Sequence, residues 1–132
     1  MTARAKKEAP PEPGARPIPK DLVAASATPL VLSILARADN YGYAIIQRVR
    51  ELSDGKLEWT DGMLYPLLHR MARLGYLTAD WGTSPEGRRR KYYEITEAGS
   101  AELAHQRDQW ATATRTLGGL WNAAAPTRLA GA

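Results

Sequence analysis

Residues 60–96 read TDGMLYPLLHRMARLGYLTADWGTSPEGRRRKYYEIT, and this stretch decides the fold. Its first half has apolar side chains at helical spacing, with Thr60 placed to cap the helix and Gly75 placed to close it in the left-handed conformation. Its second half alternates apolar and polar residues on either side of a turn rich in glycine and arginine, as a β-hairpin does. A helix able to enter the major groove, followed by a basic hairpin able to lie along phosphates, is typical of a winged helix-turn-helix. We therefore predict a DNA-binding domain that is mostly α with a small β-hairpin.

The predicted recognition helix has a core face and an exposed face. The core stripe consists of Leu64, Leu67, Leu68, Met71 and Leu74. The exposed positions, of which those in the first two turns reach furthest into a groove, are Asp61, Gly62, Tyr65, Pro66, His69, Arg70 and Arg73. Pro66 removes one backbone hydrogen bond and crowds the carbonyl of Gly62, so we expect the first turn to bend or to tighten into another helical form.

The predicted hairpin carries concentrated positive charge. Leu77, Ala79 and Trp81 alternate with polar residues and predict a half-buried strand, residues 91–95 form its return partner, and residues 82–90 form a flexible tip. Four consecutive cations follow the turn: Arg88, Arg89, Arg90 and Lys91. Such a run on a helix is usually a solvated face, but beside a groove helix we favour contact with phosphates.

Upstream of this stretch the sequence predicts an arm and two helices. Residues 1–27 combine prolines and basic side chains with few large apolar ones, so we expect a disordered basic arm to which we give no specific role. The first helix should begin with Thr28 as its cap and Pro29 in its first turn, and Asn40 should cap the second. The apolar stripe expected for the second helix is Tyr43, Ile45, Ile46, Val49 and Leu52.

A long helix is predicted over residues 97–121, with Thr96 as its cap and Glu97 placed favourably against the helix dipole. The preceding residues, 28–96, are expected to form a complete domain with its own core. The apolar side chains of the long helix therefore need another surface on which to be buried. The residues expected at a dimer interface are Leu103, Trp110, Leu117, Leu120 and Trp121. Packing against the chain's own first helix is the alternative, and both can hold for different halves of the helix. Residues 122–132 are expected to form a flexible tail.

Composition limits the classes of function. The chain has 132 residues, 44% hydrophobic and 24% charged, which describes one small domain. A net charge of +4 favours polyanionic partners, although RNA, an acidic protein or a membrane surface would suit it equally. There is no cysteine, and the two isolated histidines, His69 and His105, do not make a usual zinc site, so we expect neither a metal nor a cofactor. Without an apolar run long enough for a membrane span or a signal peptide, we expect a cytoplasmic protein.

Three motifs resemble the PadR-type transcriptional regulators. They are YGYAIIQRV at residues 41–49, GMLYPLLHRMARLGYL at residues 62–77 and GRRRKYYEITEAG at residues 87–99, within a resemblance that runs from about residue 28 to residue 121. Membership implies a winged helix-turn-helix, a dimer built on the last helix, and repression of a nearby operon that a small molecule relieves.

The resemblance also implies roles for particular positions. It places Tyr41 and Tyr43 near the DNA backbone, and residues 88–91 on the wing. At the groove it places Thr60, Met63, Tyr65 and His69. Met63 departs from the small hydroxyl residue more usual at its position.

The chain resembles the short form of the family, whose multidrug-responsive repressors stack flat drugs between tryptophans of the dimer. Trp110 occupies the matching position, and Ala113 would leave space beside it. Thr114 stands where such regulators often carry an acidic residue, which favours a neutral aromatic effector over a cationic drug. Simple packing of Trp110 on a helix seam remains the alternative.

The expected mechanism is that of a dimeric repressor on an imperfect palindrome, with two recognition helices about 34 Å apart. A ligand between the subunits would change that spacing through its different affinity for the two states. An enzyme is not expected, because no serine or aspartate motif accompanies either histidine. Two alternatives stay open: a winged-helix module that binds another protein, and a DNA binder without a ligand.

Overall fold

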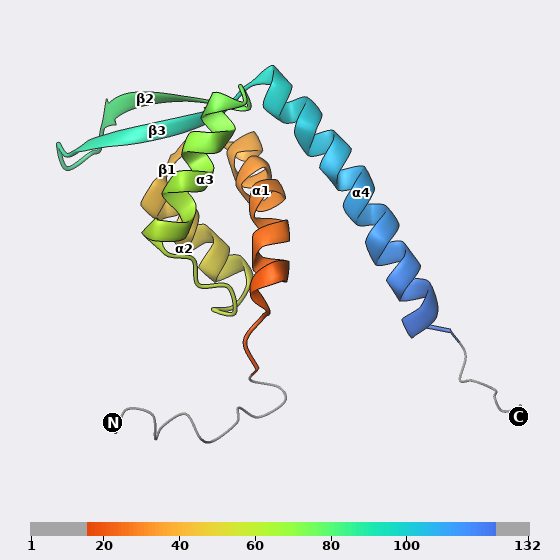
Figure 1. The fold of residues 1–132 in the computed structure, drawn as a ribbon. Coiled ribbons are helices and arrows are strands. Elements are labelled where there is room, and N and C mark those ends of the chain that lie inside the picture. Colours follow the sequence, from red (N-terminus) through yellow and green to blue (C-terminus); the bar gives the residue numbers. More distant parts are fainter. Residues whose placement is uncertain (1–15, 124–132) are drawn as a thin grey trace, which may run out of the picture.

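The computed structural model describes residues 16–123, which form a helical domain with a small sheet and one long outer helix (Figure 1). The elements in chain order are α1 (Lys20–Arg37), β1 (Asn40–Tyr41), α2 (Gly42–Leu52), α3 (Asp61–Arg73), β2 (Leu77–Thr83), β3 (Arg89–Ile95) and α4 (Glu97–Trp121). This confirms the predicted fold class, a winged helix-turn-helix followed by a C-terminal helix. Residues 1–15 of the predicted arm and 124–132 of the predicted tail lie outside the described residues. No helix between residues 16 and 123 is long and apolar enough to cross a membrane.

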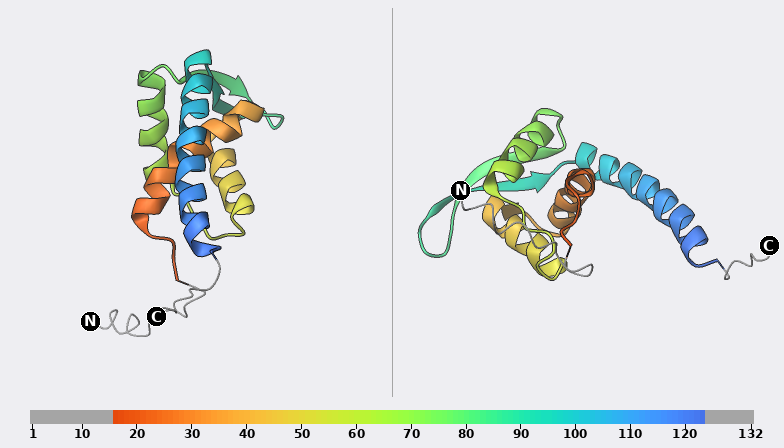
Figure 2. Two further views of the ribbon diagram at one scale, coloured as in Figure 1. Left: turned by 90° about the vertical axis from the view of Figure 1, so that its right-hand side faces the viewer. Right: turned by 60° about the horizontal axis from the view of Figure 1, so that its bottom comes forward.

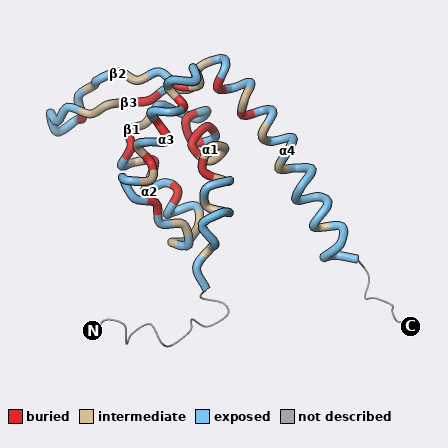
Figure 3. The backbone as a smooth tube through the Cα atoms, viewed as in Figure 1, coloured by how far each residue is buried: buried red, intermediate tan, exposed pale blue. Residues whose placement is uncertain are grey.

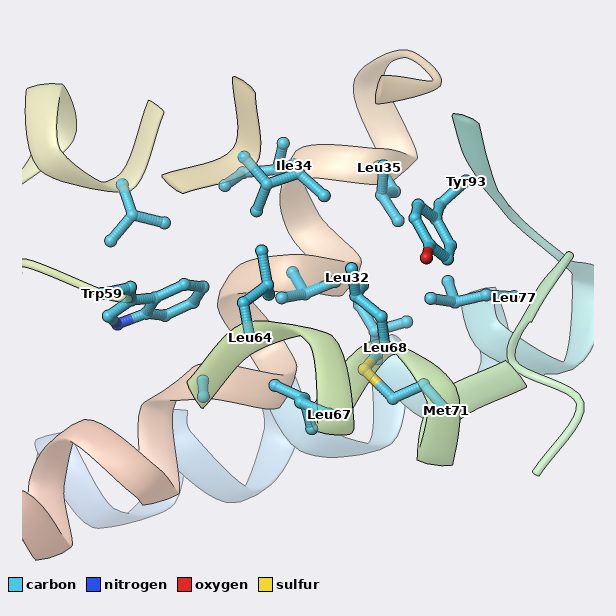
Figure 4. Packing of buried hydrophobic residues seen from close by; sticks show 14 of the residues in the cluster. Leu32, Ile34, Leu35, Trp59, Leu64, Leu67, Leu68, Met71, Leu77 and Tyr93 are labelled. Atoms are coloured by element: carbon cyan, nitrogen blue, oxygen red, sulfur yellow. The ribbon is translucent and has the colours of Figure 1, made fainter. Parts of the chain in front are cut away.

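The core lies where α1, α2 and α3 meet one face of the sheet (Figures 3 and 4). Its completely covered side chains come from all of these elements: Val31, Leu32, Ile45, Val49, Leu64, Leu68, Met71 and Tyr93. Trp59, in the loop before α3, is buried as well and packs at one end of this cluster, although periodicity gave no reason to place a loop residue in the core. Burial of these groups is the main favourable term in folding.

Helix α1 begins at Lys20, so the prediction that a disordered arm extends to residue 27 is wrong. Thr28 and Pro29 lie inside the helix rather than at its start. A proline there leaves the carbonyl of Ala25 without its helical donor, but Ala25 is exposed and water can satisfy that group. Ala27 is buried and Val23 packs against the core, which stabilises the extra turns, and Asp21 in the first turn complements the dipole.

The sheet has a third strand that the sequence did not predict. Asn40 and Tyr41 form β1 and pair antiparallel with Tyr93 and Tyr92, which gives the strand order β1-β3-β2. Asn40 therefore does not cap α2, because Tyr41 occupies that position. A strand of two residues is too short for an alternating pattern to reveal it.

Helix α2 buries a narrower stripe than predicted. Ile45 and Val49 are in the core and Ile46 is half-buried, as expected for three of the five positions. Tyr43 and Leu52 are 57% and 55% exposed, so their assignment to the core stripe is wrong. Helix α2 contacts α1, α3, β1 and β3, and these neighbours cover Ile45 and Val49 but leave Tyr43 and the last helical residue, Leu52, exposed.

Helix α3 confirms most of its predicted features. The Thr60 hydroxyl caps it by accepting the Met63 backbone N–H at 3.2 Å, and Gly75 follows it with φ 85°. Four members of the core stripe are buried, whereas Leu74 lies beyond the helix end and is exposed. The helix continues as an α-helix through Pro66, so the predicted change of helical form in its first turn is not found. The carbonyl that Pro66 deprives of a donor belongs to Gly62, which is open to water.

The hairpin is longer than predicted, and this changes where its charges lie. Pairing runs from Leu77 opposite Ile95 to Thr83 opposite Arg89, so Arg89 and Arg90 belong to β3 and not to the tip. The tip is closed by Ser84, whose backbone N–H donates to the Arg88 carbonyl at 2.8 Å and whose hydroxyl accepts from the Arg88 N–H at 3.0 Å. Arg89, Arg90 and Lys91 are therefore held on a strand instead of a flexible loop, and Arg88 stays on the tip.

Helix α4 has the predicted bounds, and only its first half packs on the domain. The Thr96 hydroxyl caps it by accepting the Gly99 N–H at 3.0 Å. Leu103 is buried in the chain's own core, so its assignment to a dimer interface is wrong and the alternative of packing on the domain holds for this half. The second half runs away from α1 into open space (Figures 1 and 2). Leu120 and Trp121 are each 74% exposed there.

Candidate nucleic-acid interface

The exposed side of α3 presents the predicted groove residues in two groups. Thr60, His69 and Arg70 are exposed, as residues that reach a groove must be. Met63 and Tyr65 are half-buried and rest against the core cluster. The Met63 side chain is therefore partly used for packing, and its backbone N–H is occupied by the Thr60 cap.

Tyr65 is fixed by its contact with the start of α2. Gly42 lies directly under the phenol ring, and a Cβ at that position would overlap the Tyr65 side chain. Burial, and secondarily the negative charge of Asp61, raise the pKa of Tyr65 above its ordinary value. The phenol is thus neutral at physiological pH and keeps a proton that it can donate in a hydrogen bond.

A hollow of about 440 Å³ joins α3 to the hairpin. It is lined by Tyr41, Gly42, Tyr65, His69, Trp81, Arg89, Arg90, Lys91 and Tyr93. These residues come from five elements, β1, α2, α3, β2 and β3, and they include most of the predicted DNA-binding residues. Thr60, Met63 and Arg70 lie on α3 outside the hollow, and Arg88 lies on the tip.

Within the described part of the chain, the cations of this surface form no ion pair with a carboxylate. The two ion pairs found within residues 16–123 both involve α2, where Arg48 lies 3.3 Å from Glu51 and Arg50 lies 3.7 Å from Glu58. The hairpin arginines instead contact aromatic rings, since the guanidinium of Arg89 lies 4.8 Å from the centre of the Trp81 ring. A cation held in this way keeps its full charge for a phosphate.

The positions of Tyr43 and Trp81 differ from what the sequence predicted. Tyr43 is exposed on α2 away from the hollow, and its hydroxyl accepts a hydrogen bond from Gln47 at 3.0 Å. Trp81 lines the hollow but was considered only as a strand residue, and it is 60% exposed instead of half-buried. The signal that points to it is the register, because only the pairing of Trp81 with Lys91 places the indole beside the cations.

The predicted ligand residues lie at the junction of α1 and α4. Trp110 is half-buried and borders a hollow of about 190 Å³ against α1, and with Ala113 it borders another of about 230 Å³. Both are below the usual size of a drug-binding pocket, about 300 Å³ or more. The Thr114 hydroxyl donates to the Trp110 carbonyl at 2.8 Å. One chain alone therefore offers the indole face without an enclosed site.

The fold and the basic hairpin beside an exposed helix define the chain as a winged helix-turn-helix protein of the kind that regulates transcription. The model of the transcriptional regulator PadR-like family matches residues 31–105, more than half of the sequence. The chain belongs to this family.

Solved structures and a sequence relative agree with that assignment. A PadR family transcriptional regulator from Eggerthella lenta is 31% identical with a TM-score of 0.64, over 78% of this chain and 88% of that chain. Another, from Clostridium difficile, is 28% identical with a TM-score of 0.64, over 73% of this chain and 98% of that chain. An uncharacterized protein from Lysinibacillus sphaericus is 28% identical over 91 residues, which are 69% of this chain and 84% of that protein.

The contact between Gly42 and Tyr65 can be tested by substitution. Gly42→Ala should lower the free energy of unfolding by about 1–3 kcal/mol, because the new methyl group overlaps the phenol and forces it to move. The same substitution in a Tyr65→Ala background should cost much less, since the obstacle is gone. Chemical denaturation at fixed protein concentration measures both values, and an equal cost in the two backgrounds would contradict the contact.

Proposed function

We propose that the protein is a dimeric DNA-binding repressor whose operator binding is modulated by a small aromatic ligand held between the subunits. The observation that carries the DNA-binding part is the hollow between α3 and the hairpin, where unpaired cations and hydrogen-bonding side chains meet. His69 and Tyr65 can approach base edges or the backbone from α3, while Arg89 and Lys91 approach phosphates from β3.

The cap of α3 adds to this surface. Thr60 satisfies the Met63 N–H, and Gly62 in the first turn is exposed and has no side chain of its own. The carboxylate of Asp61 in the same turn offsets the positive end of the helix dipole, so the positive charge that a phosphate backbone would meet lies on the wing. The PadR-like family membership agrees with such a role.

The second half of α4 supports a homodimer. Its exposed apolar residues, in the part of the chain that the structure describes, are Leu117, Leu120 and Trp121. A two-fold axis beside α4 would bury these side chains in both subunits and set two recognition helices about 34 Å apart, the spacing that an imperfect palindrome requires.

The same two-fold axis would also complete a binding site for the effector beside Trp110. Each Trp110 borders only small open hollows in its own chain, and a second copy would supply the missing wall. A neutral aromatic molecule that binds one spacing of the subunits better than another would then change the affinity for DNA.

The DNA contact is tested with Arg88→Ala, Arg89→Ala and Arg90→Ala in one chain. Three cations fewer should weaken binding to DNA from upstream of the protein's own gene by roughly tenfold or more, and the salt dependence should become shallower by about 0.9 for each phosphate contact removed. Electrophoretic mobility shifts at low and moderate salt measure both effects.

A matched control removes three exposed cations that lie outside the hairpin and outside α4: Lys20→Ala, Arg37→Ala and Lys56→Ala. The net charge falls equally, so an equal loss of affinity would mean that charge alone acts and that the hairpin is not the contact. Absence of a shift at any salt with the unaltered protein would favour the alternative, a winged-helix module that binds another protein.

The dimer is tested with Leu117→Glu and Leu120→Glu together. Carboxylates buried at an apolar contact are costly, so sedimentation velocity should show a dimer for the unaltered chain and a monomer for the variant. Leu74→Glu, at a site that is 57% exposed beyond α3, is the control and should leave the dimer intact. A variant that still sediments as a dimer would remove this half of α4 from the interface.

Ligand binding is tested with acridine at pH 7.5, where it is a neutral planar aromatic. It should quench tryptophan fluorescence in a saturable manner, and Trp110→Ala should abolish the saturable part because the stacking surface is lost. Trp81→Ala, far from α4, should leave it unchanged. Saturable quenching that persists in Trp110→Ala would favour a DNA binder without this ligand site.

A further inference from the structure

Strand β3 carries two adjacent arginines that project from opposite faces of the sheet. β3 is the central strand, and successive side chains on a strand alternate in direction. Arg89 shares a face with Trp81 and Tyr93, because Trp81 pairs with Lys91 and Ala79 pairs with Tyr93. Arg90 shares the other face with Tyr92 and with Tyr41, which pairs with Tyr92.

Each arginine lies over an aromatic ring of a different neighbouring strand. The guanidinium of Arg89 is 4.8 Å from the centre of the Trp81 ring on β2. The guanidinium of Arg90 is 4.1 Å from the centre of the Tyr41 ring on β1. Both pairs are diagonal: the direct partner of Trp81 is Lys91, two residues after Arg89, and the direct partner of Tyr41 is Tyr92, two residues after Arg90. Aromatic and long side chains can span this separation.

The ring that holds Arg90 is itself held in place. Tyr41 meets the ring of Tyr92 edge to face, with 5.6 Å between the ring centres and an interplanar angle of 74°. Gly82 gives the Tyr92 ring its room, since a Cβ at Gly82 would come within 2.9 Å of Tyr92 Cδ1. On this face of the sheet, Tyr92 therefore supports the ring of Tyr41, and the ring of Tyr41 supports the guanidinium of Arg90.

We propose that Trp81 and Tyr41 are positioning residues that hold Arg89 and Arg90 extended for contact with the phosphates of duplex DNA. This inference rests on the proposed DNA-binding function. An arginine without a partner must lose rotamer freedom when it binds, whereas one already seated on a ring has lost much of it. A carboxylate would also fix the arginine, but it would cancel the charge and occupy the N–H donors. A ring face holds the flat guanidinium and leaves its in-plane N–H groups free for phosphate oxygens.

The exposure of Trp81 fits this role better than a role in packing. Its indole is 60% exposed at the end of β2, beyond the core-facing residues Leu77 and Ala79. Arg89 and Arg90 leave β3 from opposite faces, and both border the hollow between α3 and the hairpin.

Double-mutant cycles on the full-length chain test the proposal, with a random-sequence 30-base-pair duplex at low salt as the probe. Phosphate contacts are independent of sequence, so no operator is required. Trp81→Leu should weaken binding about two- to fivefold, the value of an exposed cation–π pair, with an unchanged salt dependence. Arg89→Ala should weaken binding and lower the salt slope by about 0.9. In the Arg89→Ala background, Trp81→Leu should have no further effect.

The pair on the other face is tested in the same way with Tyr41→Leu and Arg90→Ala. Tyr41→Phe and Trp81→Phe keep a ring and should retain most of the affinity, and circular dichroism verifies that each variant is folded. Additive losses in both cycles would overturn the proposal, because the rings would then contact DNA directly. Equal losses in the phenylalanine and leucine variants, or no loss in either, would overturn it as well. A protein that binds no duplex at low salt would refute the proposed function itself, whereas duplex binding with additive cycles would refute only this inference.

Discussion

Burial of Tyr93 at the middle of β3 is the constraint on which the rest of the structure depends. Its side chain lies among core residues of α1 and α3, and its backbone sits between β1 and β2, where Asn40 and Ala79 are its partners. One residue therefore fixes the sheet against the helices and fixes its register at the same time. Because side chains alternate along a strand, a slip by one position would expose Tyr93 and turn Arg89 and Lys91 to the opposite face.

The candidate interface follows from that register. α3 is anchored by Leu64 and Leu68, which leaves Tyr65 and His69 on its outer side, facing the end of β3. Burial of the apolar side chains of α3 thus sets the direction of its polar side chains. The arginines of β3 are held by contacts with aromatic rings and not by carboxylates. The strand carries its charge at a defined distance from the helix, while a flexible tip would have had to order its arginines at the moment of binding.

Helix α4 links this domain to its proposed partner. Leu103 ties the first turns of the helix to the core, Trp110 is half-buried beside α1, and Leu117, Leu120 and Trp121 are exposed in the described structure. In the proposed dimer, a movement at Trp110 or Leu120 would pass along α4 to the winged domain that Leu103 anchors. Such a connection is what a change in the spacing of two recognition helices would require.

The sequence by itself determined the features that depend on neighbouring residues. The caps at Thr60 and Thr96, the turn at Gly75 and the stripe of α3 all follow from local hydrogen bonds and helical periodicity. Tertiary structure decided β1, the placement of Arg89 and Arg90 on β3, the helical turns before Pro29 and the inward position of Leu103. Each of these depends on contacts between residues far apart in the chain, which supply the burial or the strand pairing that outweighs a local preference.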